Sequence, residues 1–304
     1  MISLVIPVYN EEAIIDELLQ RSLATLERIG ENFEIIIVDD GSTDGSLQKL
    51  LEYHENDHRV KVVELSRNFG HQAAFTAGLR RATGDFIVMM DGDLQDAPEL
   101  IAEMYQAMVN GNYDVVNGYR TSRAEKGLKG FMFSVFHKLF AIALNERDVE
   151  NIGNFSMLNR AALEALKQLK EKTRYLPGLR NYVGFKQGYL DYDRAARKEG
   201  APKMRFLHLA GLATDALFSF SRLPIKICFY LGLIGAIVFL TLGLFTFFND
   251  ETPWQTDNRL LFIGMFFLGS VQLAFIGIVG EYVFKAYKES QDRPMYFIRN
   301  EYLQ

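Results

Sequence analysis

The stretch FIVMMDGDLQDAPE (residues 86–99) changes abruptly from apolar side chains to an acidic cluster. Its apolar half is typical of a strand that is covered on both faces of a sheet. Asp91 and Asp93 lie two positions apart directly after that strand, and this spacing predicts a cation site at the lip of the sheet. Asp96 is better explained as a helix N-cap, because Glu99 follows three positions later.

Similar apolar runs recur before and after this stretch. They are SLVIPV (3–8), FEIIIVDD (33–40), VKVVEL (60–65), DFIVMMD (85–91) and YDVVNG (113–118). Segments with helical patterning separate them, at residues 11–29, 44–56, 71–82 and 97–111. Alternating strands and helices predict an α/β domain with a mostly parallel, Rossmann-like sheet.

Three polar clusters follow strands of this predicted sheet. They are Tyr9-Asn10-Glu11, Asp39-Asp40-Gly41-Ser42 and Asp91-Gly92-Asp93. Ligands bind at the carboxyl ends of strands in such sheets, so the clusters predict one site. The glycine-rich phosphate motifs G-x-G-x-x-G and G-x-x-x-x-G-K-[ST] are missing there. Carboxylates repel a diphosphate unless a divalent cation lies between them, so a nucleotide at this site implies Mg²⁺ or Mn²⁺.

The carboxylates of Asp39 and Asp40 end the second predicted strand. Such groups accept hydrogen bonds from a base N–H or from ribose hydroxyls. The alternative is a capping turn, because GSTDGS (41–46) is rich in turn-forming residues. Together with the acidic pair after the fourth strand, the ligand-binding interpretation is favoured.

The last third of the chain contains two long apolar blocks, Ile227–Phe248 and Leu260–Phe284. Each is long enough to cross a membrane, whose hydrocarbon core is about 30 Å thick. The loop between them is acidic and the outer flanks are basic, which predicts that both ends of the pair lie in the cytoplasm. Residues 204–224 fit an amphipathic helix on the membrane surface, although a packing helix explains them nearly as well.

Composition excludes several other classes. The formal net charge of -5 gives no support for a nucleic-acid partner. The single cysteine, Cys228, excludes an internal disulfide framework and a cysteine-based zinc cluster. The N-terminus lacks the basic region of a secretory signal, so we expect the first two hundred residues to be cytoplasmic, at a bacterial inner membrane or its equivalent.

Four motifs together carry a family resemblance: IPVYNEE (6–12), VDDGSTD (38–44), RNFGHQAAFTAG (67–78) and DGDLQDAPE (91–99). In this order they resemble the family 2 glycosyltransferases of the GT-A fold. With two membrane helices, the chain is most similar to polyisoprenyl-phosphate glycosyltransferases, relatives of dolichol-phosphate mannose synthase. The likeness continues to GEYVFKAYKESQDRPMY (280–296). It implies a GT-A domain (1–203), an amphipathic helix (204–224), a two-helix membrane region (225–288) and a cytoplasmic tail (289–304).

The resemblance also implies roles for individual residues. Those that would bind the nucleotide are Pro7, Tyr9, Glu11, Asp39, Asp40 and Asp91. Those that would bind the metal and the donor phosphates are Asp91, Asp93 and Gln95. Arg120 and Arg123 would lie near the sugar or the lipid phosphate and, with the acidic pair, form the catalytic set. Arg194, Arg197 and Lys203 would bind the acceptor phosphate, although a basic patch that attracts anionic lipid explains them equally well.

The segment GNFSMLNR (153–160) departs from the family pattern. Asn154 stands where relatives have an acid proposed as a base, Ser156 replaces an arginine, and Pro202 stands where serine is frequent. A phosphate monoester is largely dianionic at neutral pH and needs no base, whereas an alcohol must lose its proton. Asn154 therefore favours a phosphate acceptor.

These observations predict an inverting, metal-dependent enzyme that moves a sugar from a UDP-linked donor to a membrane polyprenyl phosphate. Two alternatives stay open: transfer to the hydroxyl of a lipid or a lipid-linked saccharide, and a membrane nucleotide-binding partner protein without catalysis. Glycines in the apolar blocks would allow close helix approach in a homo-oligomer, but ordinary membrane composition explains them as well.

Overall fold

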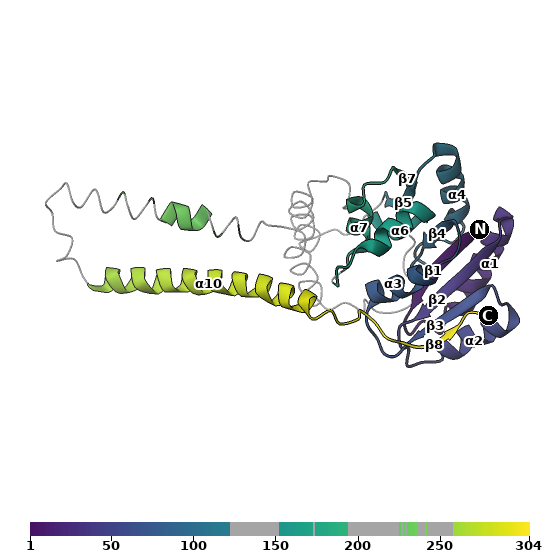
Figure 1. Ribbon diagram of the computed structural model, residues 1–304, viewed down its shortest axis with the longest axis horizontal. Helices are drawn as coiled ribbons and strands as arrows, with labels where there is room; N and C mark the ends of the chain where they lie inside the picture. Colours follow the sequence, from purple (N-terminus) through teal and green to yellow (C-terminus); the bar gives the residue numbers. More distant parts are fainter. Residues whose placement is uncertain are drawn as a thin grey trace. The chain divides into compact units, whose positions relative to one another are not determined.

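The computed structural model describes residues 1–121, 152–172, 174–193 and 258–304, with a few helical residues between 225 and 241 (Figure 1). The chain divides into two compact units. The first comprises Met1–Met132, Arg147–Lys203 and Arg293–Gln304, and the second comprises Phe133–Glu146 and Met204–Asp292. The first unit contains the sheet, and the second contains the long helix α10.

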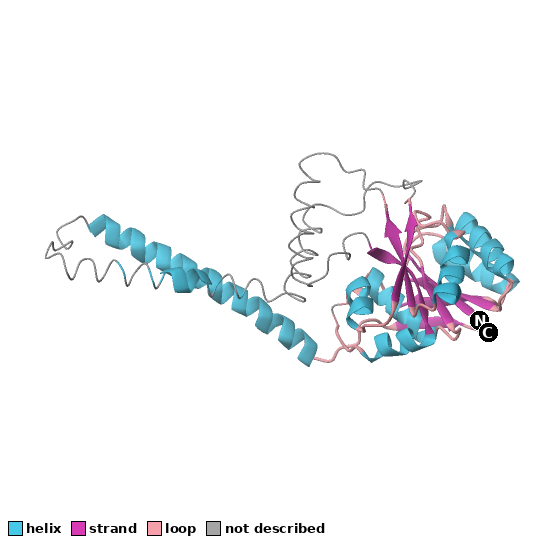
Figure 2. Cartoon of the chain, turned by 90° about the horizontal axis from the view of Figure 1, so that it is seen from above, coloured by secondary structure: helices cyan, strands magenta, loops and turns pink. Residues whose placement is uncertain are grey.

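The first unit is built on an eight-stranded sheet in the order β7-β5-β6-β4-β1-β2-β3-β8 (Figures 1 and 2). Its strands are β1 (Ile2–Val8), β2 (Phe33–Asp39), β3 (Val60–Leu65), β4 (Phe86–Met89), β5 (Val115–Arg120), β6 (Ile152–Asn159), β7 (Gln187–Tyr192) and β8 (Ile298–Tyr302). Only β6 and β8 run against their neighbours. The predicted mostly parallel α/β sheet is confirmed, and so are the five strands predicted from apolar runs.

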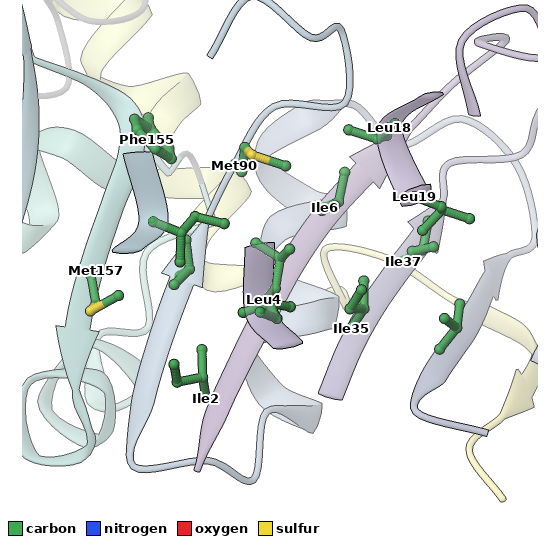
Figure 3. Packing of buried hydrophobic residues seen from close by; sticks show 14 of the residues in the cluster. Ile2, Leu4, Ile6, Leu18, Leu19, Ile35, Ile37, Met90, Phe155 and Met157 are labelled. Carbon is green, nitrogen blue, oxygen red and sulfur yellow. The ribbon is translucent and has the colours of Figure 1, made fainter. Parts of the chain in front are cut away.

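Helices cover both faces of the sheet, which explains the uninterrupted apolar runs. They are α1 (Ile15–Ile29), α2 (Ser46–Asn56), α3 (His71–Arg81), α4 (Leu100–Gly111), α6 (Arg160–Gln168) and α7 (Leu176–Tyr182). On one face, Leu4 and Ile6 of β1 join a buried cluster with Leu18 of α1 (Figure 3). On the other face, α3 lies so close that a Cβ on Gly78 would overlap the side chain of Val5.

The strand order creates the crevice that ligands use in folds of this kind. β1 pairs with β2 on one side and with β4 on the other, both in parallel. The chain runs from β1 to β2 and β3 on one side and then crosses back to β4 on the other side of β1, and in sheets with such a reversal the ligand crevice lies outside the carboxyl ends of these strands. Asp39 ends β2, and Asp91 follows β4, so the fold brings two of the predicted acidic clusters to this crevice.

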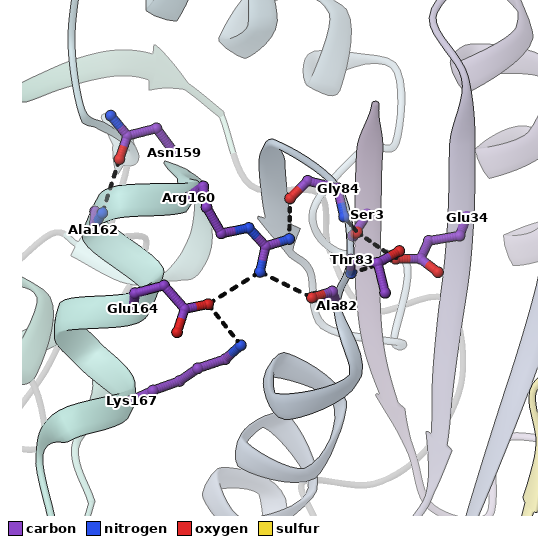
Figure 4. A network of polar contacts seen from close by, with 10 residues as sticks. All are labelled: Ser3, Glu34, Ala82, Thr83, Gly84, Asn159, Arg160, Ala162, Glu164 and Lys167. Atoms are coloured by element: carbon purple, nitrogen blue, oxygen red, sulfur yellow. Dashed lines mark hydrogen bonds and ion pairs between the residues drawn. The ribbon is translucent and has the colours of Figure 1, made fainter.

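A buried carboxylate fastens the opposite end of the sheet (Figure 4). Glu34 is only 2% exposed and accepts hydrogen bonds from Ser3 Oγ (2.6 Å) and Lys61 Nζ (2.7 Å). Thr83 donates to the same carboxylate from its backbone N–H (2.7 Å) and its hydroxyl (2.8 Å). Burial by itself would raise the pKa of Glu34, but these donors outweigh it and hold the pKa below its usual value.

The end of the chain returns to the sheet as β8. Residues 289–304 were expected to form a tail, but Ile298–Tyr302 pair antiparallel with β3 at the sheet edge. Arg299 (3.0 Å) and Asn300 (2.7 Å) both donate to the buried carboxylate of Glu64 on β3. The polar sequence IRNEY gives no strand signal, and this strand forms because the edge of β3 supplies its backbone partners.

The second unit contains α10 (Asn258–Ser290), which includes the second apolar block. Among the described residues, one stretch, Leu268–Ser290, is long and apolar enough to cross a membrane, with a mean hydropathy of 1.2. Its apolar side chains are exposed, as at Leu273 and Ile276. Most of the first block, Ile227–Phe248, and all of residues 204–224 lie outside the described residues, so the second span and the surface helix stay predictions.

Candidate active site

Hydrogen bonds connect the loops that follow β1 and β2 at the crevice. The Asn10 N–H donates to Ser42 Oγ (3.0 Å), and the Thr43 N–H donates back to the Asn10 side chain (2.8 Å). Asn10 adopts a φ of 54°, a left-handed conformation that asparagine tolerates. This turn follows Pro7 at the end of β1 and places Tyr9 at the surface, 36% exposed. The residues of the first two clusters that are predicted to bind the nucleotide therefore lie together at the carboxyl ends of β1 and β2.

Asp39 presents an acceptor that no described residue uses. Its carboxylate is 1% exposed, and one oxygen accepts from the Ser42 N–H (3.1 Å). The other oxygen, Oδ1, is buried and has no hydrogen-bond partner among the described residues. Burial raises the pKa of Asp39, and the negative charges of Glu64 and Asp44 add to this effect. A buried carboxylate oxygen without a donor is costly, and an N–H donor of a ligand would satisfy it.

Both carboxylate oxygens of Asp40 accept hydrogen bonds from the protein backbone. Asp40 is 3% exposed, and its two oxygens accept from the backbone N–H groups of Phe69 (2.7 Å) and Gly70 (2.9 Å). Burial raises the pKa of Asp40, while these two hydrogen bonds oppose the rise. The geometry therefore assigns Asp40 to holding the loop that precedes α3. This loop positions His71, the first residue of α3.

The acidic loop after β4 packs tightly on β1. A Cβ on Gly92 would lie 2.8 Å from the backbone oxygen of Pro7, so only glycine fits between the two aspartates. The backbone N–H of Gln95 donates to Asp93 Oδ1 (3.2 Å). Leu94, with a φ of 56°, provides the left-handed turn that brings this N–H into place.

Asp91 is contacted by His71 and Asn154, a proximity that the sequence did not predict. His71 Nε2 lies 3.1 Å from Asp91 Oδ1, and Asn154 Nδ2 lies 3.4 Å from the same oxygen. Burial lowers the pKa of His71, but the carboxylates of Asp91, Asp93 and Asp40 outweigh this and leave it raised. Although the motif RNFGHQ carries His71, its distance in sequence from Asp91 concealed the contact.

Strand β6 explains why Asn154 reaches the site. It is antiparallel to β4, with Met89 opposite Ser156, so extending the register by two residues places Asn154 beside Asp91. The side-chain oxygen of Asn154 accepts from Gln72 Nε2 (3.2 Å) on α3. The amide is thus held from both sides, and it supplies no group that accepts a proton at neutral pH.

Arg180 is a buried cation beneath this part of the site. Its side chain is fully buried and donates to the backbone oxygens of Gly153 (2.6 Å) and Asn154 (3.0 Å). Burial lowers the pKa of Arg180 to about 10, although the charge of Asp91 opposes the change. No pattern in the sequence singled out Arg180, because its surroundings come from strands far away in the chain.

The acidic loop fits a divalent cation that a bound substrate completes. The described residues contain no group of three His, Cys, Asp or Glu side chains that could form a complete metal cage. Mg²⁺ is commonly held by one or two carboxylates together with substrate phosphates and waters. Asp91 and Asp93 match that donor set. We do not assign Asp96 to the cation, because its carboxylate accepts a hydrogen bond from the Tyr192 hydroxyl (2.6 Å).

Two predictions near the loop have different outcomes. Asp96 was expected to cap a helix, but α4 begins at Leu100 with Glu99 in the N-cap position and without a side-chain cap, so that prediction is wrong. Arg120, at the end of β5, lies beside Gly153, where a Cβ would overlap its guanidinium group, and its catalytic role stays a prediction. Four further predicted residues lie outside the described residues: Arg123, Arg194, Arg197 and Lys203.

Comparisons with known proteins give consistent matches. The sequence profile described as Glycosyl transferase family 2 matches residues 3–167. A bactoprenol glucosyl transferase of Shigella phage SfV is 33% identical over 304 residues, covering 99% of this chain and 98% of its own. An undecaprenyl-phosphate 4-deoxy-4-formamido-L-arabinose transferase of Pectobacterium atrosepticum is 33% identical over 316 residues, covering 98% and 92%.

A solved structure shares the fold. Glucosyl-3-phosphoglycerate synthase from Mycobacterium tuberculosis, in complex with Mn²⁺, UDP and phosphoglyceric acid, superposes with a TM-score of 0.54. The match covers 72% of this chain and 76% of that chain at 18% sequence identity. At this identity the similarity concerns the fold alone.

Proposed function

Because the chain belongs to glycosyl transferase family 2, we propose that it moves a sugar from a UDP-linked donor to a membrane polyprenyl phosphate. The resemblance of its sequence motifs to this family is confirmed, and so is the α/β GT-A fold. The proposed transfer inverts the anomeric carbon and gives a lipid-phosphate sugar for modification of a cell-envelope glycan.

One observation carries the donor part of the proposal: Asp39 and the acidic loop end strands on either side of β1. The buried Oδ1 of Asp39 suits the N–H that uracil presents between its two carbonyl groups. The pair Asp91 and Asp93 suits the cation that accompanies a diphosphate. Pro7, Tyr9 and Glu11 lie between these two groups in the strand order and would contact the nucleoside.

The predicted cation would be held by Asp91 and Asp93, with Gln95 at the end of the same turn. When bound, Mg²⁺ or Mn²⁺ supplies a Lewis acid that stabilises the leaving diphosphate. Arg120 adds a fixed positive charge at the edge of this loop. Asp40 contributes indirectly, because it holds the loop from which His71 reaches Asp91.

The environment of Asn154 supports a phosphate acceptor. Its amide is held between Gln72 and Asp91 and is not a base, so the side chain at this position cannot take the proton of an alcohol. A phosphate monoester attacks as a dianion and needs positioning by cations instead. We propose that Arg123, Arg194, Arg197 and Lys203 provide these cations. The names of the two relatives specify different sugars, so the sugar must come from experiment.

The proposed enzyme is an integral membrane protein with residues 1–203 in the cytoplasm and two spans within residues 225–288. Support comes from α10 and from the names of the relatives, which refer to membrane lipid carriers. We propose that residues 204–224, predicted to form a helix on the membrane surface, bring the lipid head group to the active site.

A donor screen with purified full chain tests the proposal. Radiolabelled UDP-sugars are incubated with Mn²⁺ or Mg²⁺ and undecaprenyl phosphate, with Asp93→Ala as the inactive control. We expect a radiolabelled lipid from which mild acid releases the sugar. Chelation of the divalent cation should stop the formation of this lipid. An acid-resistant product would instead indicate a hydroxyl acceptor. UDP binding without transfer from any donor would indicate a partner protein that is not an enzyme.

A further inference from the structure

A hydrogen-bonded chain of three side chains links the acidic loop to Arg120. The Tyr192 hydroxyl donates to Asp96 Oδ1 (2.6 Å) and accepts from Arg120 Nε (3.2 Å). Arg120 and Tyr192 are partners in the parallel pairing of β5 and β7, so their side chains leave the sheet on the same face. Asp96 ends the turn that carries the proposed metal ligands.

The chain is held rigidly by its surroundings. Tyr192 is 6% exposed and Asp96 is fully buried. A Cβ on Gly118 would lie 2.8 Å from Cε1 of Tyr192, so glycine is needed there to make room for the ring. The ring of Phe155 lies edge-on to that of Tyr192, with 5.6 Å between their centroids. The hydroxyl therefore has one available position.

The direction of the hydrogen bonds follows from chemistry. Burial raises the pKa of Tyr192, and the charge of Asp96 raises it further, so the hydroxyl keeps its single proton. The hydroxyl donates this hydrogen to Asp96 in a hydrogen bond, and a lone pair of its oxygen accepts the Nε–H of Arg120. With Nε bound in this way, the terminal nitrogen Nη2 of Arg120 lies against the backbone of Gly153.

We propose that Tyr192 is a positioning residue for sugar transfer, which holds the Arg120 guanidinium in register with the Asp91–Asp93 loop through Asp96. This inference rests on the proposed function, because Arg120 acts there on a phosphate or on the sugar. Tyr192 itself does not touch the reacting atoms. Its hydroxyl fixes the angle of a planar group whose hydrogen bonds depend on orientation.

Tyr192→Phe tests the proposal, because it removes the hydroxyl and keeps the packed ring. We expect kcat to fall about 10- to 100-fold, because a displacement of about 1 Å in a group that positions the reactants can cost up to about 100-fold in rate. The KM for the donor should change by less than about threefold, since the side chains proposed to bind the donor and its cation, Asp39, Asp91 and Asp93, are not replaced. Tyr189→Phe, on the same strand and 49% exposed, is the matched control.

A double-mutant cycle separates positioning from a purely structural contribution. If Tyr192 acts through Arg120, then Tyr192→Phe should cause no further loss in an Arg120→Ala background. If the kcat of the double variant falls by the product of the two single losses, the proposal is overturned. It is also overturned if Tyr192→Phe has the same kcat as the wild type. If Tyr192→Phe does not fold, Asp96→Asn and Asp96→Ala replace it. The amide keeps an acceptor for the hydroxyl, so alanine should lose more kcat, and equal losses would overturn the proposal.

The same assays distinguish the two levels of inference. Absence of transfer by the wild-type chain with every donor would overturn both the proposed function and the positioning role. Transfer by the wild type that Asp93→Ala abolishes and Tyr192→Phe leaves unchanged would overturn the positioning role alone. Thermal melting and UDP binding in the presence of Mn²⁺ confirm that each variant is folded.

Discussion

Replacing Asp39 by asparagine separates ligand binding from stability. The carboxylate has one oxygen on the Ser42 N–H and a second, buried oxygen without a partner among the described residues. Asparagine has only one oxygen, so it can serve the Ser42 N–H or a base N–H, but not both. The other position then receives an NH₂ group, which faces a donor instead of an acceptor.

The expected magnitude follows from that lost hydrogen bond. A hydrogen bond to a charged group contributes about 1.5–3 kcal/mol, which corresponds to a loss of about 10- to 150-fold in UDP affinity. The free protein should not lose stability, because burial raises the pKa of Asp39 and its ionisation therefore opposes folding. Since the raised pKa brings protonation closer to neutrality, acid should weaken UDP binding to the wild type more than to Asp39→Asn.

Calorimetric titration of the full chain with UDP and Mn²⁺ measures this effect, and thermal melting measures the stability of the free protein. CDP is a useful second ligand, because the ring nitrogen of cytosine lacks the N–H that uracil presents. We expect CDP and UDP to bind Asp39→Asn with similar affinity. Asp85→Asn, at the opposite end of the sheet and 73% exposed, is the control. Unchanged UDP affinity in Asp39→Asn would refute the reasoning.

Three further changes test other parts of the structure. Glu34→Ala should destabilise the protein by about 3–5 kcal/mol, because it leaves the Lys61 ammonium without its buried partner. Since the folded pKa of Glu34 is lowered, its stabilisation is present above the unfolded pKa of about 4.3 and is lost as pH falls through the folded value. Melting curves between pH 3 and 7 should therefore converge for wild type and Glu34→Ala in acid, and a constant difference would contradict this. Asn154→Asp should raise kcat by less than about tenfold, because a phosphate acceptor needs no base; a rise of 10²-fold or more, the usual contribution of a general base, would indicate an alcohol acceptor. Removal of residues 298–304 should lower the melting temperature by several degrees and promote aggregation measured by light scattering, because it exposes the edge of β3 and the carboxylate of Glu64; an unchanged melting temperature would show that β8 contributes little.

Hydropathy predicts two spans because that signal is local and needs no tertiary information. The structure describes one helix that could cross a membrane, so the second span and the orientation stay predictions. Glycosylation accessibility or cysteine labelling of the loop at residues 249–258 would test both.

The sequence alone determined the architecture of the sheet core and the place of the acidic pair. Each of the five predicted strands is rich in apolar residues, and the predicted helices between them carry an apolar face, so both patterns are visible within short windows. Strand β7 (QGYLDY) is also parallel but lacks such a run, and no sequence pattern indicated it. Asp91 and Asp93 were predictable because they follow such a run directly, and parallel sheets bind ligands at that end.

Only the tertiary structure decided which side chains meet there. The antiparallel register of β6 brings Asn154 to Asp91, and the parallel register of β5 and β7 pairs Arg120 with Tyr192. β8 adds a strand from the far end of the chain. These contacts depend on strand order and register, which arise from the packing of the whole sheet, and no local pattern encodes them.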